Sequence, residues 1–181
     1  IQETHATAHQ QQKFRHAAHH CCNVVFGKEV SPTTTTVRAV GDRQQYTKVA
    51  DRAAGGGVAI IARTECSLVD TGKTDATVAG LYDTQRWCEA FIPLLGQDRG
   101  FYVASAYATT RANNDDFFAA VFDAAVRHGT QVPYVIGIDA QQDVDTSQML
   151  QNVIATGEFF NALEVTNSQD CLAPTFCRFA Q

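Results

Sequence analysis

The sequence predicts one α/β domain in which short strands in hairpin order are combined with amphipathic surface helices. Its 181 residues, 45% of them hydrophobic, are enough for a single domain with a core of ordinary size. Apolar runs at 86–95 and 101–107 are separated by a Gly-containing turn, which is typical of antiparallel strands. Apolar residues recur at helical spacing in 8–21 and 114–128. No internal repeat is visible.

The N-terminal part predicts a helix, a strand and a long irregular segment. Phe14, Ala17, Ala18 and Cys21 follow the i, i+3, i+4, i+7 spacing of one helix face, and polar residues fill the positions between them. A short strand is expected at 23–26. Residues 27–55 have weak periodicity and a run of four Thr, so we expect a long loop or an insertion within the domain.

Most of the predicted strands lie in the central part of the chain and just after it. Glycines open the first of these strands, where the missing Cβ permits a close approach of chain or ligand. Strands are expected at 56–63, 67–70, 86–95, 101–107 and 132–138. The helix predicted at 114–128 has Asp115 and Asp116 in its first turn, Arg127 and His128 in its last, and Gly129 as its stop. A second helix is expected at 146–155.

Composition restricts the classes of partner. No run reaches the roughly 18 apolar residues of a membrane span, and we expect an intracellular protein, nuclear or cytoplasmic, that does not bind membranes. The net charge of −5 argues against a broad basic face for nucleic acid but not against a nuclease, because a carboxylate site for a divalent cation is locally acidic. The oligomeric state is not determined by these features.

Three polar residues at the ends of predicted strands are the candidates for chemistry. Asp139 ends the apolar run 132–138, Tyr107 ends the run 101–107, and Glu3 lies in the segment Gln-Glu-Thr at positions 2–4. Each has an ordinary structural role as well: a strand-end turn for Asp139, a satisfied buried hydroxyl for Tyr107, and helix-entry electrostatics for Glu3. Their joint occurrence favours one site.

These motifs, in this order, resemble the endonuclease/exonuclease/phosphatase superfamily. The resemblance rests on Gln-Glu-Thr at 2–4, Gly-Gly-Val-Ala-Ile at 56–60, the strand ending in Tyr107, the following helix, and Ile-Gly-x-Asp-x-amide at 136–141. Gln-Glu-Thr-His at 2–5 most resembles the retroelement and apurinic-type endonucleases. The resemblance implies a four-layer fold in which a sandwich of two mostly antiparallel or mixed sheets is flanked by helices, here incomplete.

The resemblance also implies a reaction, a cofactor and roles for four residues. It implies Mg²⁺-dependent (or Mn²⁺-dependent) phosphodiester hydrolysis, with Glu3 as the metal ligand and Tyr107 near the scissile phosphate. Asp139 would orient or deprotonate the attacking water. Gln141 stands where the family has Asn, and its side chain is one methylene longer, so it cannot hold a phosphate at the same distance.

Two family features are missing from this sequence. The Asn on a strand before Gln-Glu-Thr and the C-terminal Ser-Asp-His have no counterpart, and we expect a fragment that lacks strands at both ends. Three functions therefore stay open: a nucleic-acid-directed hydrolase, a catalytically impaired remnant or binding module, and a phosphatase acting on a small molecule. The sequence also offers weaker metal patterns, a helix-borne zinc site at His5 and His9 or His16 and His20, and a calcium loop from Asp139 to Asp145.

Overall fold

The structure is a computed structural model that describes residues 6–30, 35–40, 43–48, 57–94, 99–109, 114–129, 132–161 and 175–178. Its largest element is a six-stranded sheet in the order β5-β6-β7-β8-β10-β9. These strands are β5 (Val69–Asp70), β6 (Trp87–Pro93), β7 (Gly100–Tyr107), β8 (Tyr134–Asp139), β9 (Phe160–Asn161) and β10 (Thr175–Arg178). All the pairings are antiparallel except that of β7 with β8, which is parallel. The parallel pair requires a crossover connection, and α3 (Asp115–Val126) provides it.

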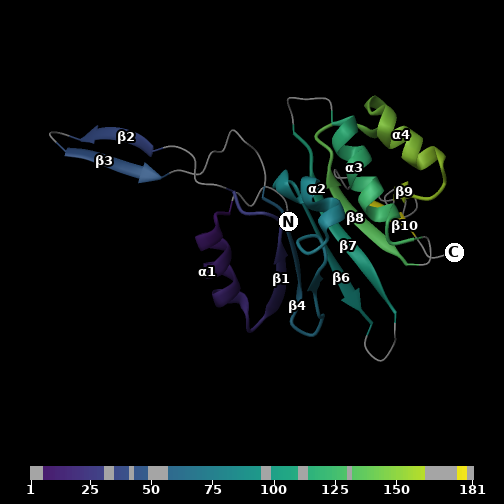
Figure 1. The fold of residues 1–181 in the computed structure, drawn as a ribbon, viewed down its shortest axis with the longest axis horizontal. Helices are drawn as coiled ribbons and strands as arrows, with labels where there is room; N and C mark the ends of the chain where they lie inside the picture. Colours follow the sequence, from purple (N-terminus) through teal and green to yellow (C-terminus); the bar gives the residue numbers. More distant parts are fainter. Residues whose placement is uncertain are drawn as a thin grey trace.

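A smaller sheet of two antiparallel strands, β1 (Cys22–Phe26) and β4 (Ala59–Arg63), faces the large one. Val25 and Ile60 pack from this sheet against Cys88 and Ala90 of β6 and Tyr107 of β7, with Val58 completing the cluster. Helix α1 (Ala8–Ala18) lies beside the small sheet in Figure 1. These side chains form an apolar layer between the two sheets.

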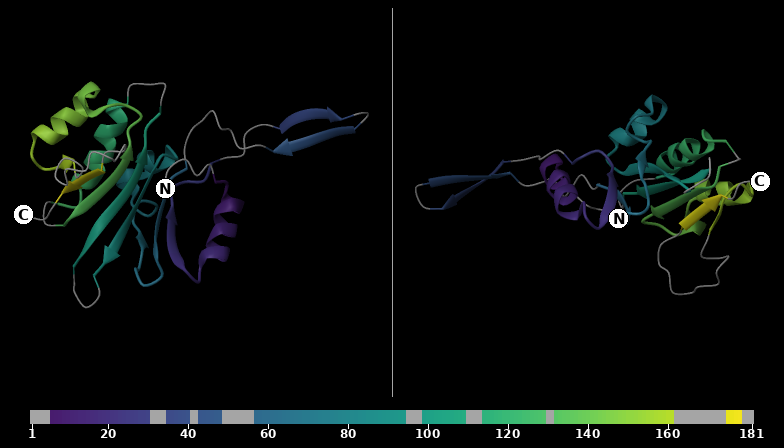
Figure 2. Two further views of the ribbon diagram at one scale, coloured as in Figure 1. Left: turned by 180° about the vertical axis from the view of Figure 1, so that it is seen from behind. Right: turned by 90° about the horizontal axis from the view of Figure 1, so that it is seen from below.

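The second and larger core lies on the other face of the six-stranded sheet. Helices α3 and α4 (Gln148–Ala155) cover this face, on the side of the large sheet away from α1 (Figure 2). Phe118 and Val121 of α3 and Leu150 of α4 pack there against Trp87 and Ile136, and all five side chains are inaccessible to solvent. The order of layers, helix, sheet, sheet, helix, confirms the predicted α/β sandwich.

The described elements agree with most of the predicted ones and add some that the sequence pattern did not indicate. The expected loop at 27–55 contains an antiparallel hairpin of β2 (Thr35–Val40) and β3 (Arg43–Lys48), which lies apart from the sandwich in Figure 1. Three short helical segments were also not predicted: η2 (Ala76–Val78), α2 (Ala79–Asp83) and η3 (Val144–Thr146).

Helix α1 begins where the sequence predicts, but of the predicted apolar face only Ala18 is buried. Thr7 caps it, because its hydroxyl accepts from the N–H of Gln10 while the Gln10 side chain accepts from the Thr7 N–H. Gln11 and Ala18 are the buried residues, whereas Phe14 is 41% exposed. Gln11 is buried because its amide donates to the carbonyl of Gly27 at 3.3 Å, a contact that apolar periodicity does not reveal.

Candidate active-site edge

Several strand ends meet at one edge of the sandwich, here called the candidate edge. It contains the C-terminal ends of β7 and β8 and the N-terminal end of β6. The Tyr107 N–H donates to the carbonyl of Arg86 at 2.9 Å, and the Ala108 N–H donates to the carbonyl of Asp139 at 2.9 Å. These backbone bonds fix the three strand ends side by side, so Tyr107 and Asp139 share one edge.

Tyr107 and Asp139 are partners in the parallel register of β7 and β8 and therefore lie on the same face of the sheet. This is the face toward the small sheet, because Tyr107 packs with Val25 and Ile60. Tyr107 is only 5% exposed, whereas Asp139 is half-buried. The difference arises because the small sheet packs over β6 and β7, while Asp139 lies one strand farther out on β8. A buried phenol thus lies beside an accessible carboxylate position.

Gln141 follows Asp139 in a tight turn. Its N–H donates to Oδ1 of Asp139 at 3.3 Å, and its backbone has a φ of 53°, in the left-handed region. Its side chain is exposed. Asn enters this region more readily than Gln, because its shorter polar side chain can bond locally. The turn therefore has the backbone geometry that suits the Asn of the resembled motif, with Gln in its place.

Glu3 lies outside the described residues, but the segment that follows it is anchored at the candidate edge. The Val30 N–H donates to the carbonyl of Ala6 at 3.1 Å, four residues after the end of β1. The Gly27 N–H donates to Val58, and the Gly57 N–H donates to the carbonyl of Gln85, next to the start of β6. Ala6 is thus connected to the edge that carries Tyr107, and Glu3 precedes it by three positions.

Arg86 is a residue of this edge that sequence reasoning did not single out. Its guanidinium carbon lies 4.3 Å from the centroid of the Phe117 ring, in the first turn of α3. The residue is half-buried; burial lowers the pKa of Arg86, and the nearby Tyr107 acts in the opposite direction. In the sequence, Arg86 is simply a polar residue at the start of the predicted strand 86–95. Only the folded structure brings its charge near Tyr107.

Side-chain hydrogen bonds of Asn114 and Ser147 hold the starts of α3 and α4. After β7, the amide of Asn114 donates to the carbonyl of Thr109 at 2.8 Å and accepts from the Thr109 N–H at 3.1 Å. Asn114 is 3% exposed. At the start of α4 the Ser147 hydroxyl donates to the Asp115 carboxylate at 2.7 Å. These contacts fix the starts of α3 and α4 close to the ends of β7 and β8.

The oxygen donors at this edge are of the chemical type that binds a hard cation such as Mg²⁺. Asp139 offers carboxylate oxygens, the ligand type that Mg²⁺ prefers, and Mg²⁺ needs only one or two carboxylates beside water and substrate oxygens. In the part of the chain that the structure describes, no group of three or more His, Cys, Asp or Glu side chains is arranged to hold a metal. Within those residues neither the pair His16 and His20 nor the stretch from Asp139 to Asp145 belongs to such a group, whereas His5 of the other predicted zinc pair lies outside the described residues.

A densely charged cluster lies elsewhere, on the helix-covered face of the large sheet. There Glu89 of β6 accepts from Thr71, Arg127, His128 and Tyr134, and Arg127 also contacts Asp75. Burial opposes ionisation of Glu89, but these hydrogen bonds and the Arg127 charge outweigh it, so the pKa of Glu89 is lowered. The charged side chains of this cluster are therefore bonded to one another.

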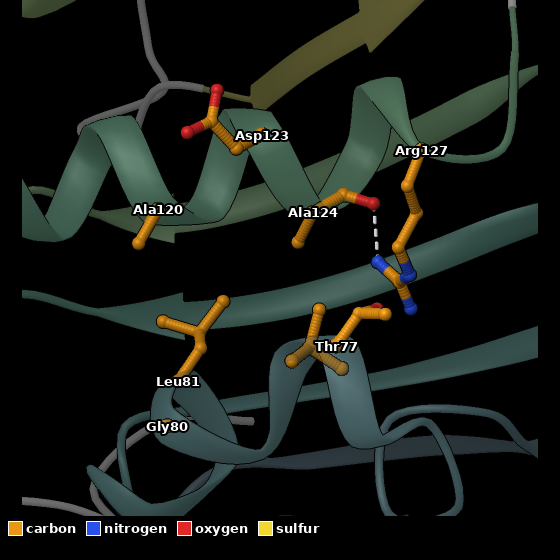
Figure 3. A pocket seen from close by; sticks show the side chains of 8 residues that line it. Thr77, Gly80, Leu81, Ala120, Asp123, Ala124 and Arg127 are labelled. Atoms are coloured by element: carbon orange, nitrogen blue, oxygen red, sulfur yellow. Dashed lines mark hydrogen bonds between the residues drawn. The ribbon is translucent and has the colours of Figure 1, made fainter.

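A pocket of about 300 Å³ opens beside this cluster, between η2, α2 and α3 (Figure 3). Gly80 and Leu81 lie on one side of it and Ala120 and Ala124 on the other, with Arg127 at one end. The lining includes none of Tyr107, Asp139 and Gln141. Because the Arg127 guanidinium is already bound to two carboxylates, this pocket is separate from the candidate edge in both place and chemistry.

Comparisons with known proteins give fold matches only. No family model matches the sequence, and no curated protein matches it. Among the described residues, no helix has the length and apolar character needed to cross a bilayer.

Solved structures, in contrast, match nearly the whole chain. The human Nocturnin catalytic domain with bound sulfate aligns with a TM-score of 0.59 at 14% identity, over 98% of this chain and 67% of that one. The endonuclease domain of TRAS1, a telomere-specific non-LTR retrotransposon, gives 0.52 at 11% identity, over 98% and 81%. An endonuclease/exonuclease/phosphatase family protein from Bacteroides thetaiotaomicron gives 0.55 at 12% identity, over 94% and 65%. The chain therefore has the fold of the endonuclease/exonuclease/phosphatase superfamily.

Proposed function

We propose that this chain is a Mg²⁺-dependent phosphodiester hydrolase that acts on nucleic acid, formed by residues 1–181 as one domain. The observation that carries the proposal is the parallel register of Tyr107 with Asp139 at the candidate edge. The fold supports the class of reaction, since the similar structures include a retrotransposon endonuclease domain. The sulfate in the Nocturnin structure supports an oxyanion ligand for this fold.

Asp139 and Tyr107 have complementary tasks in this proposal. Asp139 orients a water molecule and accepts its proton, because a half-buried carboxylate is accessible to water. The Tyr107 ring is held between the sheets, so its hydroxyl is a fixed donor toward a phosphoryl oxygen. Arg86, beside Tyr107, adds a cation for the phosphate, and Gln141 supplies an amide in place of the Asn that the fold's relatives are expected to have.

Glu3 is the proposed magnesium ligand, with Asp139 at the same edge. A bound Mg²⁺ would polarise a phosphoryl oxygen and stabilise the leaving oxygen. The anchoring of Ala6 by Val30 supports this assignment, because three residues span at most about 10 Å of extended chain.

A second candidate function is a catalytically impaired module of the same fold. The left-handed, exposed Gln141 favours it, because the longer amide sits on a strained backbone and extends into solvent. A phosphatase acting on a small phosphorylated molecule is the third candidate.

A nicking assay separates these candidates. Supercoiled plasmid and an abasic duplex are incubated with the chain and Mg²⁺, and the Asp139→Asn variant is measured in parallel. We expect nicking that falls by about 100-fold or more in the variant, the usual effect of removing a general base. Equal nicking by both proteins would remove Asp139 from the mechanism, and hydrolysis of a small phosphomonoester alone would favour the phosphatase.

The metal assignment is tested by binding, not turnover. Titration of Mg²⁺ or Mn²⁺ followed by calorimetry should give weak binding that is lost in Glu3→Gln. Glu29→Gln is a suitable control, because this carboxylate lies in the same N-terminal region and has no proposed role. Equal affinity in Glu3→Gln would take Glu3 out of the metal site.

A further inference from the structure

The described residues on either side of the β2–β3 hairpin, Val30 and Gly57, are linked to the candidate edge by backbone hydrogen bonds. The chain enters the hairpin after Val30, whose N–H is bonded to Ala6, and returns at Gly57, whose N–H is bonded to Gln85 at 2.7 Å. Gln85 is the neighbour of Arg86, and Arg86 is bonded to Tyr107. The two described residues that flank the hairpin, Val30 and Gly57, are therefore linked to the edge proposed to carry out hydrolysis, whereas β2 and β3 extend away from the sandwich (Figures 1 and 2).

The charge of this segment is opposite to that of the chain. Residues 31–56 contain four basic and two acidic residues, a net charge of +2, although the whole chain has −5. The two strands contain three basic residues, Arg38, Arg43 and Lys48, and neither Asp nor Glu. Basic residues concentrated on one projection of an acidic protein are complementary to a polyanion.

The strand register groups the basic positions. Arg38 is paired with Gln45 and Val40 with Arg43, so Arg38 and Arg43 occupy neighbouring positions on one face of the ribbon. Thr36 and Thr47 form the next pair on this face. Arginine and hydroxyl residues are the usual partners of phosphate oxygens, and a two-stranded ribbon is narrow enough to follow a groove of duplex nucleic acid.

We propose that the β2–β3 hairpin is a nucleic-acid-binding arm, which contacts the phosphate backbone of a duplex beyond the site of cleavage. This inference rests on the proposed function and deepens it by naming the duplex as substrate class and the arm as its second contact. A six-residue strand spans about 20 Å. Since duplex phosphates on one strand repeat every 3.4 Å or so, a strand of this length spans about six of them.

The test compares two variants of equal charge change. In the arm variant Arg38, Arg43 and Lys48 are replaced by Gln, and in the control variant Lys13, Arg63 and Lys73 are replaced by Gln; these three are exposed and lie outside the hairpin. Binding of a fluorescent duplex is measured by anisotropy across a salt series, with EDTA present so that no cleavage occurs. Far-ultraviolet circular dichroism and thermal unfolding of all three proteins check that each is folded.

We expect the arm variant to bind about tenfold more weakly or worse at about 100 mM salt, with a salt slope reduced by up to about 2.7, or 0.9 for each phosphate contact. The control variant should match the parent chain. Equal slopes in the arm variant and the parent, an equal loss in both variants, or no duplex binding by the parent would each overturn the inference. Binding of an acidic protein surface in preference to the duplex would overturn it as well.

The binding comparison and the cleavage assay can succeed or fail separately. Cleavage that persists in Asp139→Asn would end the proposed mechanism but leave the binding comparison intact. Conversely, Asp139-dependent cleavage with an unchanged salt slope in the arm variant would support the proposed hydrolysis and exclude a nucleic-acid-binding role for the hairpin.

Discussion

Glu89 and Arg127 form a bidentate ion pair beneath the helices that cover the large sheet. Nη2 of Arg127 lies 2.7 Å from one carboxylate oxygen of Glu89, and Nη1 lies 3.1 Å from the other. Glu89 is inaccessible to solvent and the Arg127 side chain is 16% exposed. A pair this deeply buried is held in place by its partners, so removing one member leaves the other charge without compensation.

We predict that Glu89→Gln lowers the free energy of unfolding by about 3–5 kcal/mol, the usual cost of breaking a buried ion pair from one side. Urea unfolding at pH 7 measures the change. Asp83→Asn is a matched control, because Asp83 forms an exposed ion pair with Lys28, and such pairs contribute about 1 kcal/mol or less. A loss below about 1 kcal/mol in Glu89→Gln would contradict the prediction.

The same pair predicts a pH dependence. The folded-state pKa of Glu89 is lowered, as the hydrogen bonds from His128, Thr71 and Tyr134 and the charge of Arg127 outweigh burial. A lowered carboxyl pKa stabilises the folded state above the unfolded pKa of about 4.3, and this stabilisation is lost as the pH falls through the folded-state value. Urea midpoints measured from pH 6 to pH 2 should therefore fall more steeply in the parent chain than in Glu89→Gln. Parallel profiles would exclude Glu89 as the source of the acid sensitivity.

Arg86 should affect catalysis more than stability. Arg86→Gln removes a cation that interacts electrostatically with Tyr107, and we expect kcat/KM for duplex cleavage to fall by about 10- to 100-fold through loss of phosphate contacts. Arg15→Gln is the matched control, because the Arg15 guanidinium also lies over an aromatic ring, that of Phe26, at 5.1 Å. Both variants should lose about 1 kcal/mol of stability or less, but only Arg86→Gln should lose activity. Equal activity in the two variants would argue against a phosphate role.

Replacement of Gln141 by Asn should improve both stability and turnover. Gln141 has a φ of 53°, which costs a residue with a long side chain about 1 kcal/mol, and Asn accepts this conformation more easily. Gln85, with a φ of 66°, allows a matched substitution outside the turn of Asp139. Gln85→Asn should gain similar stability in thermal unfolding without a gain in nicking rate. A Gln141→Asn variant that is more stable but no more active would favour the impaired module.

The close contact with the Trp87 ring leaves no room for a side chain at Gly72. A Cβ added at Gly72 would lie 2.7 Å from Cζ3 of Trp87, a side chain that is inaccessible to solvent and cannot shift. Gly72→Ala should therefore destabilise the fold by about 1–3 kcal/mol. Gly80→Ala is the control, since a Cβ there meets no atom within 4 Å and Ala favours the helix α2. Urea unfolding should show opposite signs for the two variants.

The sequence predicted the regular elements best where apolar periodicity is strong. The helix expected at 114–128 is α3 (Asp115–Val126), and the strand expected at 101–107 is β7 (Gly100–Tyr107). It failed where polar contacts decide burial: the buried face of α1 is set by the bond of Gln11 to Gly27, and Phe14 stays exposed. The hairpin within 27–55 escaped prediction because its strands mix apolar residues such as Val37 and Val40 with polar ones and show no sustained alternation.

For the candidate site, the sequence by itself determined which residues end strands and so predicted Asp139 and Tyr107 as members of one site. That inference needs only the positions where apolar runs stop. Only the tertiary structure decided that their strands are adjacent and parallel, that Arg86 lies beside them, and that Glu89, Arg127 and His128 form a separate internal cluster. The physical reason is that strand pairing and burial of charge depend on contacts between residues far apart in the chain, which local spacing does not encode.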